Sequence, residues 1–206
     1  MSPDKVATIR QGWKRIPKQV KLFLLKGILL FTSWKLLYLL LLLPNRTLDR
    51  PLTHSIGTST AGTLNFFGGS PDYSAASEIY NKPMDDGSTI PEPVMQLYHH
   101  REKVLSVADV CNGLELMVLY AGLILCLPAS PSRKITFIAA GLLLIFLVNI
   151  IRCAALVQVY LHKPEYVNFF HHYLFTFLVY ALIFWLWYLF TNFTKRPADA
   201  SFLPAS

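Results

Sequence analysis

Apolar residues along this chain are gathered into four long runs. The runs cover about residues 22–43, 110–128, 135–159 and 172–193. Each is close to the roughly 20 residues that an α-helix needs to cross a bilayer. The pattern therefore predicts a mainly α fold, a polytopic membrane helix bundle with about four transmembrane helices.

Residues 44–109, between the first two runs, have a mixed pattern. Leu52, Ile56, Leu64 and Phe67 recur at helix-like spacing before a pair of glycines, which predicts a short amphipathic helix. The end of the segment, VMQLYHHREKVLSVADV, predicts two short strands on either side of residues 99–103. We therefore expect a small α/β insertion between the first two membrane helices.

Three clusters of basic residues flank the apolar runs. The clusters are residues 1–21, residues 133–134 and residues 195–196, the last within a tail of residues 194–206. Under the positive-inside rule all three indicate one topology, with both termini in the cytoplasm. Residues 44–109 and 160–171 then lie outside it, and the protein is expected to be a multi-pass protein of the cell (inner) membrane.

Composition narrows the functional classes. The chain has 206 residues, of which 53% are hydrophobic and 15% are charged. This composition is too apolar for a typical soluble domain, so the lipid bilayer is the expected environment. The net charge of +7 is concentrated near the membrane helices, so it predicts topology and not a nucleic-acid partner. Because Lys26 and Lys35 interrupt the first run and no small-residue cleavage site follows Pro44, that run is interpreted as a retained signal anchor.

Three polar residues from different runs fall at one depth. Cys111 precedes Ser132 by nearly the same length of chain as Arg152 follows it, and His172 precedes Lys195 by a similar length. With Ser132 and Lys195 at the cytoplasmic surface, all three stand roughly 30 Å above it, at about 1.5 Å per residue. They are expected to meet at the outer membrane boundary.

Cys111 is the candidate nucleophile among the three cysteines. It is expected in the first turn of its helix, where free N–H groups and the helix dipole stabilise a thiolate and lower the pKa. Cys126 and Cys153 are expected only to pack, as buried cysteines commonly do. The chain has no C-x-x-C motif and no spacing typical of structural zinc.

Arg152 has two readings, an arginine that reaches the headgroups and one that faces inward. Asn149 lies three residues earlier on the same helical face, which favours the inward orientation. An inward arginine could hold a thiolate ionised or bind the oxyanion of an acyl intermediate.

His172 is the candidate general acid and base, with His171 in reserve. His172, Thr176 and Tyr180 follow i, i+4, i+8 and form a polar stripe, whereas His171 continues into an apolar face. Together with Cys111, such a histidine suffices for acyl transfer through a thioester, so we expect no metal and no cofactor.

The residues around Cys111 have supporting roles. Asn112 and Gly113 are expected to permit a tight strand-to-helix turn, with Asp109 as a cap. Glu115 is four residues after Cys111 and is expected to form an ion pair with Lys35 of the first helix.

The segments ADVCNGL (108–114), NIIR (149–152) and HHYLFTFLVY (171–180), in this order in successive helices, resemble the exosortase/archaeosortase family. The resemblance covers roughly residues 50–190, and it implies a multi-pass membrane cysteine transpeptidase. Its members are thought to cleave exported proteins that end in a motif, a membrane helix and a basic tail, with a lipid- or glycan-linked amine or water as acceptor. The resemblance implies Cys111 as nucleophile, Arg152 as the essential arginine and His172 as the family's histidine, with His171 in reserve. With about four helices, the chain is similar to the compact members, and larger ones have about eight.

Three other functions are compatible with parts of the pattern. A thiol–quinone redox protein would need a reactive cysteine pair, for which only Cys111 and Cys153 stand at similar depth. A non-catalytic component of an exopolysaccharide or envelope assembly system would not need the polar triad. A metal site formed by His99, His100 and His171 would lack a clear carboxylate or cysteine ligand.

Overall fold

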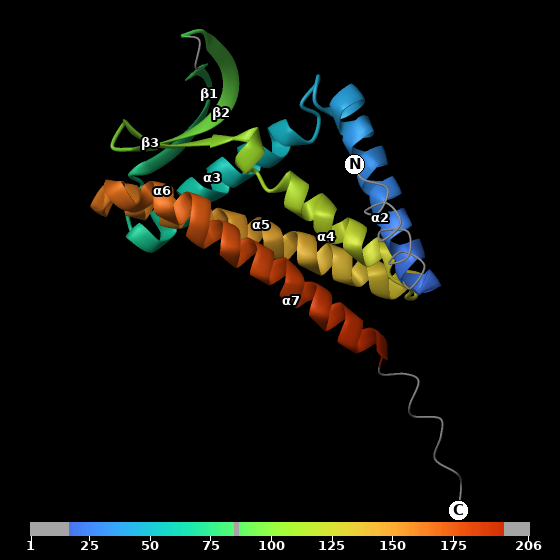
Figure 1. Ribbon diagram of the computed structural model, residues 1–206. Helices are drawn as coiled ribbons and strands as arrows, with labels where there is room; N and C mark the ends of the chain where they lie inside the picture. Colours follow the sequence, from blue (N-terminus) through green and yellow to red (C-terminus); the bar gives the residue numbers. More distant parts are fainter. Residues whose placement is uncertain (1–16, 85–86, 196–206) are drawn as a thin grey trace, which may run out of the picture.

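The computed structural model describes residues 17–84 and 87–195, so most of both predicted basic tails lies outside the described residues. Figure 1 shows how the helices and strands are arranged. In chain order they are α2 Lys18–Leu37, α3 Asp49–Gly68, β1 Tyr73–Pro83, β2 Thr89–His99, β3 Glu102–Ala108, α4 Leu114–Cys126, α5 Pro131–His162, α6 Val167–Phe169 and α7 Phe175–Lys195. Two short π-helices, Tyr38–Leu42 and Phe170–Leu174, continue α2 and precede α7.

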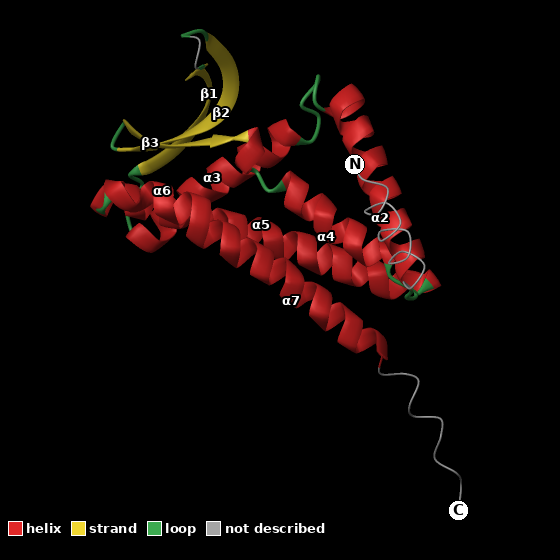
Figure 2. Ribbon diagram, in the orientation of Figure 1, coloured by secondary structure: helices red, strands yellow, loops and turns green. Residues whose placement is uncertain are grey.

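The chain has a helical part and a small sheet at one end of it (Figure 2). The sheet is antiparallel with the order β1-β2-β3, and its register pairs Tyr73 with His99 and Val94 with Ala108. The predicted short amphipathic helix is α3, which has 20 residues and packs against the sheet and α5. The mainly helical fold with an α/β insertion therefore agrees with the sequence-based expectation.

The sheet has one strand more than the pattern predicted. β1 is exposed along most of its length, so its sequence carries no alternation of apolar and polar residues that would have marked it. Only its pairing with β2 establishes it as a strand.

Three helices of the described residues are long and apolar enough to cross a membrane: Val20–Leu42, Pro131–His162 and Pro164–Phe193. The second predicted span, residues 110–128, is shorter than expected because α4 begins only at Leu114 and ends at Cys126. Its 13 residues extend about 20 Å, less than the roughly 30 Å of a hydrocarbon core. The boundary moves because residues 109–111 form a separate 3₁₀ turn.

Helix α5 joins the two hydrophobic cores of the molecule. Its C-terminal half contributes Val157 to a core that also contains Ile56 of α3 and Leu97 of β2. Its N-terminal half contributes Ile145 to a second core with Tyr120 of α4, together with buried residues of α7. Arg152 lies on α5 between these two regions, so both cores hold the helix that carries it.

Candidate functional site

Cys111 stands where the sheet passes into the helical bundle. Strand β3 ends at Ala108, residues 109–111 form the 3₁₀ turn, and the half-buried Cys111 is its last residue. Gly113 then has φ +81°, a backbone conformation that glycine adopts without steric cost. The side-chain oxygen of Asn112 accepts a hydrogen bond from the backbone N–H of Leu114 at 2.9 Å. The strand-to-helix turn is therefore present as predicted from the sequence.

The two predicted residues of α5 both bind the carbonyl oxygen of Cys111. Arg152 Nη2 donates to it at 2.5 Å and Asn149 Nδ2 donates at 3.2 Å. The Nε of Arg152 is buried and has no hydrogen-bond partner among the described residues. Arg152 thus faces inward, and its positive charge lies beside the thiol-bearing residue.

The histidine that contacts Cys111 is His171, the reserve candidate, and not His172. His171 Nε2 lies 3.8 Å from Cys111 Sγ, and His171 is half-buried whereas His172 is exposed. The expected stripe assumed α-helical periodicity, but residues 170–174 form a π-helix with i→i+5 hydrogen bonding. The extra residue in this turn brings His171, instead of His172, into line with Thr176, whose Oγ1 donates to the His171 carbonyl oxygen at 3.5 Å.

The thiol of Cys111 is in a different electrostatic environment from the one expected. Burial raises the pKa of Cys111, and the nearby Arg152 guanidinium opposes this increase. The predicted lowering assumed a place in the first turn of α4, but Gly113 separates Cys111 from that helix. The neutral thiol is therefore favoured until a base removes its proton.

A buried hydrogen-bond network, which the sequence did not predict, holds the turn at Cys111 and Asn112 against α3. Asn112 is 1% exposed, and its Nδ2 donates to Asp49 Oδ1 at 3.0 Å and to Thr53 Oγ1 at 3.2 Å. The hydroxyl of Tyr38 donates to the other oxygen of Asp49 at 3.0 Å. Asp49 and Thr53 lie on the core-facing side of α3 together with Ile56. In the sequence, polar residues on the otherwise apolar face of this helix could have indicated a buried hydrogen-bond network.

Asp109 takes part in this network instead of capping α4. Its carboxylate accepts hydrogen bonds from Arg46 Nε at 2.6 Å, from Arg46 Nη2 at 2.7 Å and from Thr53 Oγ1 at 2.7 Å. A two-pronged arginine–carboxylate pair restrains orientation as well as distance. Asp109 thereby ties the turn before Cys111 to the segment that connects α2 with α3.

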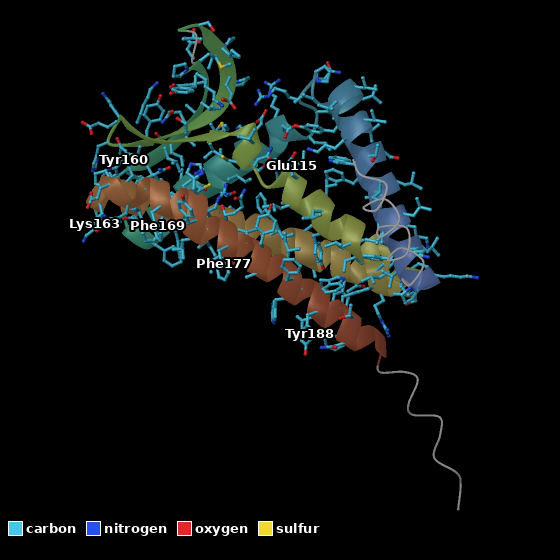
Figure 3. The ribbon with its side chains drawn as sticks, viewed as in Figure 1. Glu115, Tyr160, Lys163, Phe169, Phe177 and Tyr188 are labelled. Carbon is cyan, nitrogen blue, oxygen red and sulfur yellow. The ribbon has the colours of Figure 1, made fainter. Side chains whose placement is uncertain are left out.

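The predicted ion pair between Glu115 and Lys35 is confirmed. Lys35 Nζ lies 2.5 Å from Glu115 Oε1, and it joins α2 to the first turn of α4. Figure 3 labels Glu115 at the sheet-facing end of α4.

A cleft of about 470 Å³ opens beside Cys111 between α2, α4 and α7. Figure 1 shows α2 and α4 close together at one end and separated toward the sheet. The polar end of the cleft is lined by Tyr38, Asp49, Cys111, Arg152 and Thr176. The Lys35–Glu115 ion pair also lines the cleft, and an apolar part of its wall is formed by Phe31, Trp34, Val118, Leu119 and Val179. A polar reaction centre thus adjoins a surface suited to an apolar chain.

A family model described as transmembrane exosortase (Exosortase_EpsH) matches residues 21–189. The chain belongs to the transmembrane exosortase family. The match extends from α2 into α7 and includes Cys111, Arg152 and both adjacent histidines. No curated protein and no solved structure matches the chain.

Exosortase membership and the three candidate spans together indicate a membrane-embedded, exosortase-like role. All three cysteines, Cys111, Cys126 and Cys153, are free thiols. The disulfide that a thiol–quinone redox protein forms when it is oxidised is therefore not present between them. His171 also lies outside the cluster formed by His99 and His100, where Asp72 is the third member among the described residues. The three histidines considered as a metal site are therefore not brought together.

Proposed function

We propose that this exosortase is a cysteine transpeptidase or protease with Cys111 as nucleophile, His171 as acid and base, and Arg152 as electrostatic stabiliser. The observation that carries the proposal is the 3.8 Å approach of His171 Nε2 to Cys111 Sγ, beside the half-buried guanidinium of Arg152 and a cleft. A nucleophile within reach of a base, next to a group that favours negative charge, is the arrangement that acyl transfer needs.

The first half of the reaction forms a thioester. His171 Nε2 accepts the Cys111 thiol proton, and the thiolate attacks the substrate carbonyl carbon to form a C–S bond. Arg152 stabilises the negative charge, first on sulfur and then on the tetrahedral oxygen. The C–N bond breaks as the imidazolium of His171 returns the proton to the leaving amine. Because burial favours the neutral thiol, His171 has to act as the base in this step.

The second half transfers the acyl group. A lipid- or glycan-linked amine, or water, attacks the thioester carbonyl while His171 accepts its proton. Collapse of the intermediate breaks the C–S bond, and the proton returns to the Cys111 sulfur. The enzyme is thereby restored without a metal or a cofactor.

The proposed substrate is an exported protein that ends in a short motif, a membrane helix and a basic tail. The apolar wall of the cleft suits the helix of such a substrate, and the polar end suits the peptide just outside it. The proposed topology has both termini in the cytoplasm and the sheet outside, which puts Cys111 at the outer face of the cell (inner) membrane. The basic clusters support this orientation.

Replacing Cys111 by Ala tests the function directly. We expect the variant to insert normally and to leave a substrate protein with this C-terminal arrangement uncleaved, because no thioester can form. Cys126→Ala is the matched control, since Cys126 is the last residue of α4, at the opposite end of that helix from Cys111, and it should process normally. Immunoblotting of substrate length and mass spectrometry of a trapped adduct on Cys111 provide the measurements.

The competing function is a non-catalytic component of an exopolysaccharide or envelope assembly system. It predicts that Cys111, Arg152 and His171 can each be replaced without a change in phenotype. Continued cleavage by Cys111→Ala would refute the transpeptidase proposal.

A further inference from the structure

Three side chains with metal-binding atoms meet at the turn between β2 and β3, on elements different from those that carry Cys111, Arg152 and His171. Asp72, His99 and His100 each offer one ligand atom, and these atoms all lie within 4.8 Å of one another. Asp72 and His99 are partly buried, and His100 is exposed. The sequence showed no clear carboxylate ligand for the adjacent histidines. The structure brings one there from Asp72, which lies just before β1.

The sheet register brings the three residues together. Tyr73 is the register partner of His99, so Asp72 lies next to the last residue of β2. The backbone N–H of His100 donates to the Asp72 carbonyl oxygen at 3.1 Å, which holds the two ends of the site at the backbone level. Adjacent histidines diverge on a helix, but here His99 ends a strand and His100 begins a turn.

The turn itself is held in an uncommon conformation. His100 and Arg101 have φ values of 48° and 71°, and neither is glycine. A two-residue hairpin turn with both φ values positive ordinarily prefers Asn-Gly or similar pairs. Bulky residues in this conformation are disfavoured and tend to be found at functional sites. In this turn, His100 lies beside Asp72.

Neighbouring groups restrain two of the three candidate ligands, Asp72 and His99. Ser70 Oγ donates to Asp72 Oδ2, which leaves Oδ1 directed toward His100. The His99 ring stacks on Tyr73 with centroids 4.5 Å apart. Asn65 of α3 binds both the backbone N–H and the carbonyl of Tyr73, each at 2.8 Å. Such outer contacts fix ligand orientation and raise metal affinity.

The distances fit a bound ion better than a direct hydrogen bond. His100 Nδ1 and Asp72 Oδ1 are 3.6 Å apart, beyond hydrogen-bonding range. Two ligand atoms at about 2.0–2.2 Å from a tetrahedral zinc ion are separated by about 3.3–3.6 Å. The Asp72–His100 pair already has this separation. The other pairs, which lie within 4.8 Å, would have to close by at most roughly 1.5 Å around an ion. The geometry points to a site for Zn²⁺ or a similar borderline divalent ion, with Asp72, His99 and His100 as ligands and water completing the shell.

An ion at this position would cross-link the start of β1 to the β2–β3 turn. β3 continues directly into the turn that carries Cys111, so the cross-link would stabilise the strand that delivers the nucleophile. Binding to the folded state alone stabilises it by mass action, so zinc is expected to raise the thermal midpoint. The inference concerns a structural ion and does not rest on the proposed reaction.

The test is zinc titration of the full-length protein in detergent or nanodiscs, purified without a polyhistidine tag. In a Cys111→Ser background, which removes the thiol that could bind zinc together with His171, we expect one equivalent by calorimetry and a rise in the thermal midpoint. Asp72→Asn, His99→Gln and His100→Gln should each weaken binding about tenfold or more and reduce the thermal shift. Ser70→Ala should weaken it while all three ligands remain.

Matched controls separate this site from other histidines. His54→Gln and His171→Gln remove imidazoles elsewhere and should leave zinc affinity unchanged. Retention of binding by the Cys111→Ser protein makes the result independent of catalysis. If zinc does not bind, or if affinity is the same in the Asp72, His99 and His100 variants, the inference is overturned. A pH-dependent thermal shift without zinc dependence would instead indicate a simple His100–Asp72 ion pair and would also overturn it.

Discussion

Cys111 is held from two sides through two different atoms. Its carbonyl oxygen accepts hydrogen bonds from Arg152 and Asn149 of α5, and its sulfur faces His171. The first pair fixes where the backbone lies, and the second contact determines where the proton can go. Arg152 therefore has a positioning contact in addition to its electrostatic effect on the thiol.

The pH dependence of Cys111 alkylation tests the electrostatic effect of Arg152. Burial raises the pKa of Cys111 and Arg152 opposes the increase. Only the thiolate reacts, so the rate should rise with pH and reach half its maximum above the ordinary value of about 8.5. Arg152→Ala should move the midpoint higher, because the opposing charge is lost.

The measurement is the rate of iodoacetamide modification in a Cys126→Ala, Cys153→Ala background, so that only Cys111 reports. Arg152→Lys is the control for charge without the guanidinium geometry, and it should restore much of the wild-type midpoint. A wild-type midpoint clearly below 8.5 would contradict the described environment.

Substitution of the two adjacent histidines distinguishes their roles. His171→Ala should lower substrate processing by about 10²–10⁴-fold, the usual contribution of a general acid and base. His172→Ala should have a small effect because His172 is exposed and His171 holds the contact to Cys111. Cleavage rates of the two variants at equal expression decide the matter, and the reverse order would favour the original α-helical assignment.

At the level of elements, both π-helices adjoin the candidate site. Tyr38 of the first lines the cleft and donates to Asp49, and His171 of the second contacts Cys111. Extra residues of this kind change which side chains face a given direction, and they are frequent at functional sites. The aromatic surface of α7 away from the site includes Phe177 and Tyr188, which are exposed and labelled in Figure 3.

The turn between β3 and α4 depends on Gly113. A Cβ at this position would lie 3.3 Å from Asn149 Nδ2, and its φ of +81° is one that L-residues rarely adopt. We expect Gly113→Ala to destabilise the fold by about 1–2 kcal/mol and to disturb the Asn149 contact with Cys111. Thermal unfolding in detergent measures the first effect, and Cys111 alkylation rates measure the second.

Gly62→Ala is the matched control for this substitution. Gly62 lies in α3, and a Cβ there would meet nothing within 4 Å. An equal loss of stability in both variants would argue against a special role of the Gly113 turn.

At the level of the whole molecule, the site forms where three separate parts of the chain meet. The sheet delivers Cys111, α5 contributes Arg152 from between the two cores, and the π-helix before α7 contributes His171. α2 completes the cleft through Lys35, whose ion pair with Glu115 joins it to α4. No single element contains enough of the site to act alone.

The sequence by itself determined the helical membrane class, the insertion, the convergence of Cys111 and Arg152, and the Lys35–Glu115 pair. These follow from local hydrophobicity and from helix rise, which depend little on distant residues. Tertiary structure decided the rest. His171 replaced His172 because a π-turn breaks the assumed periodicity, and the exposed β1 was defined only by its pairing with β2. Long-range packing also placed Asp49 near the Cys111 turn and Asp72 beside His99. The neighbours of a carboxylate depend on which distant segments pack against it, and a local sequence pattern contains no information about them.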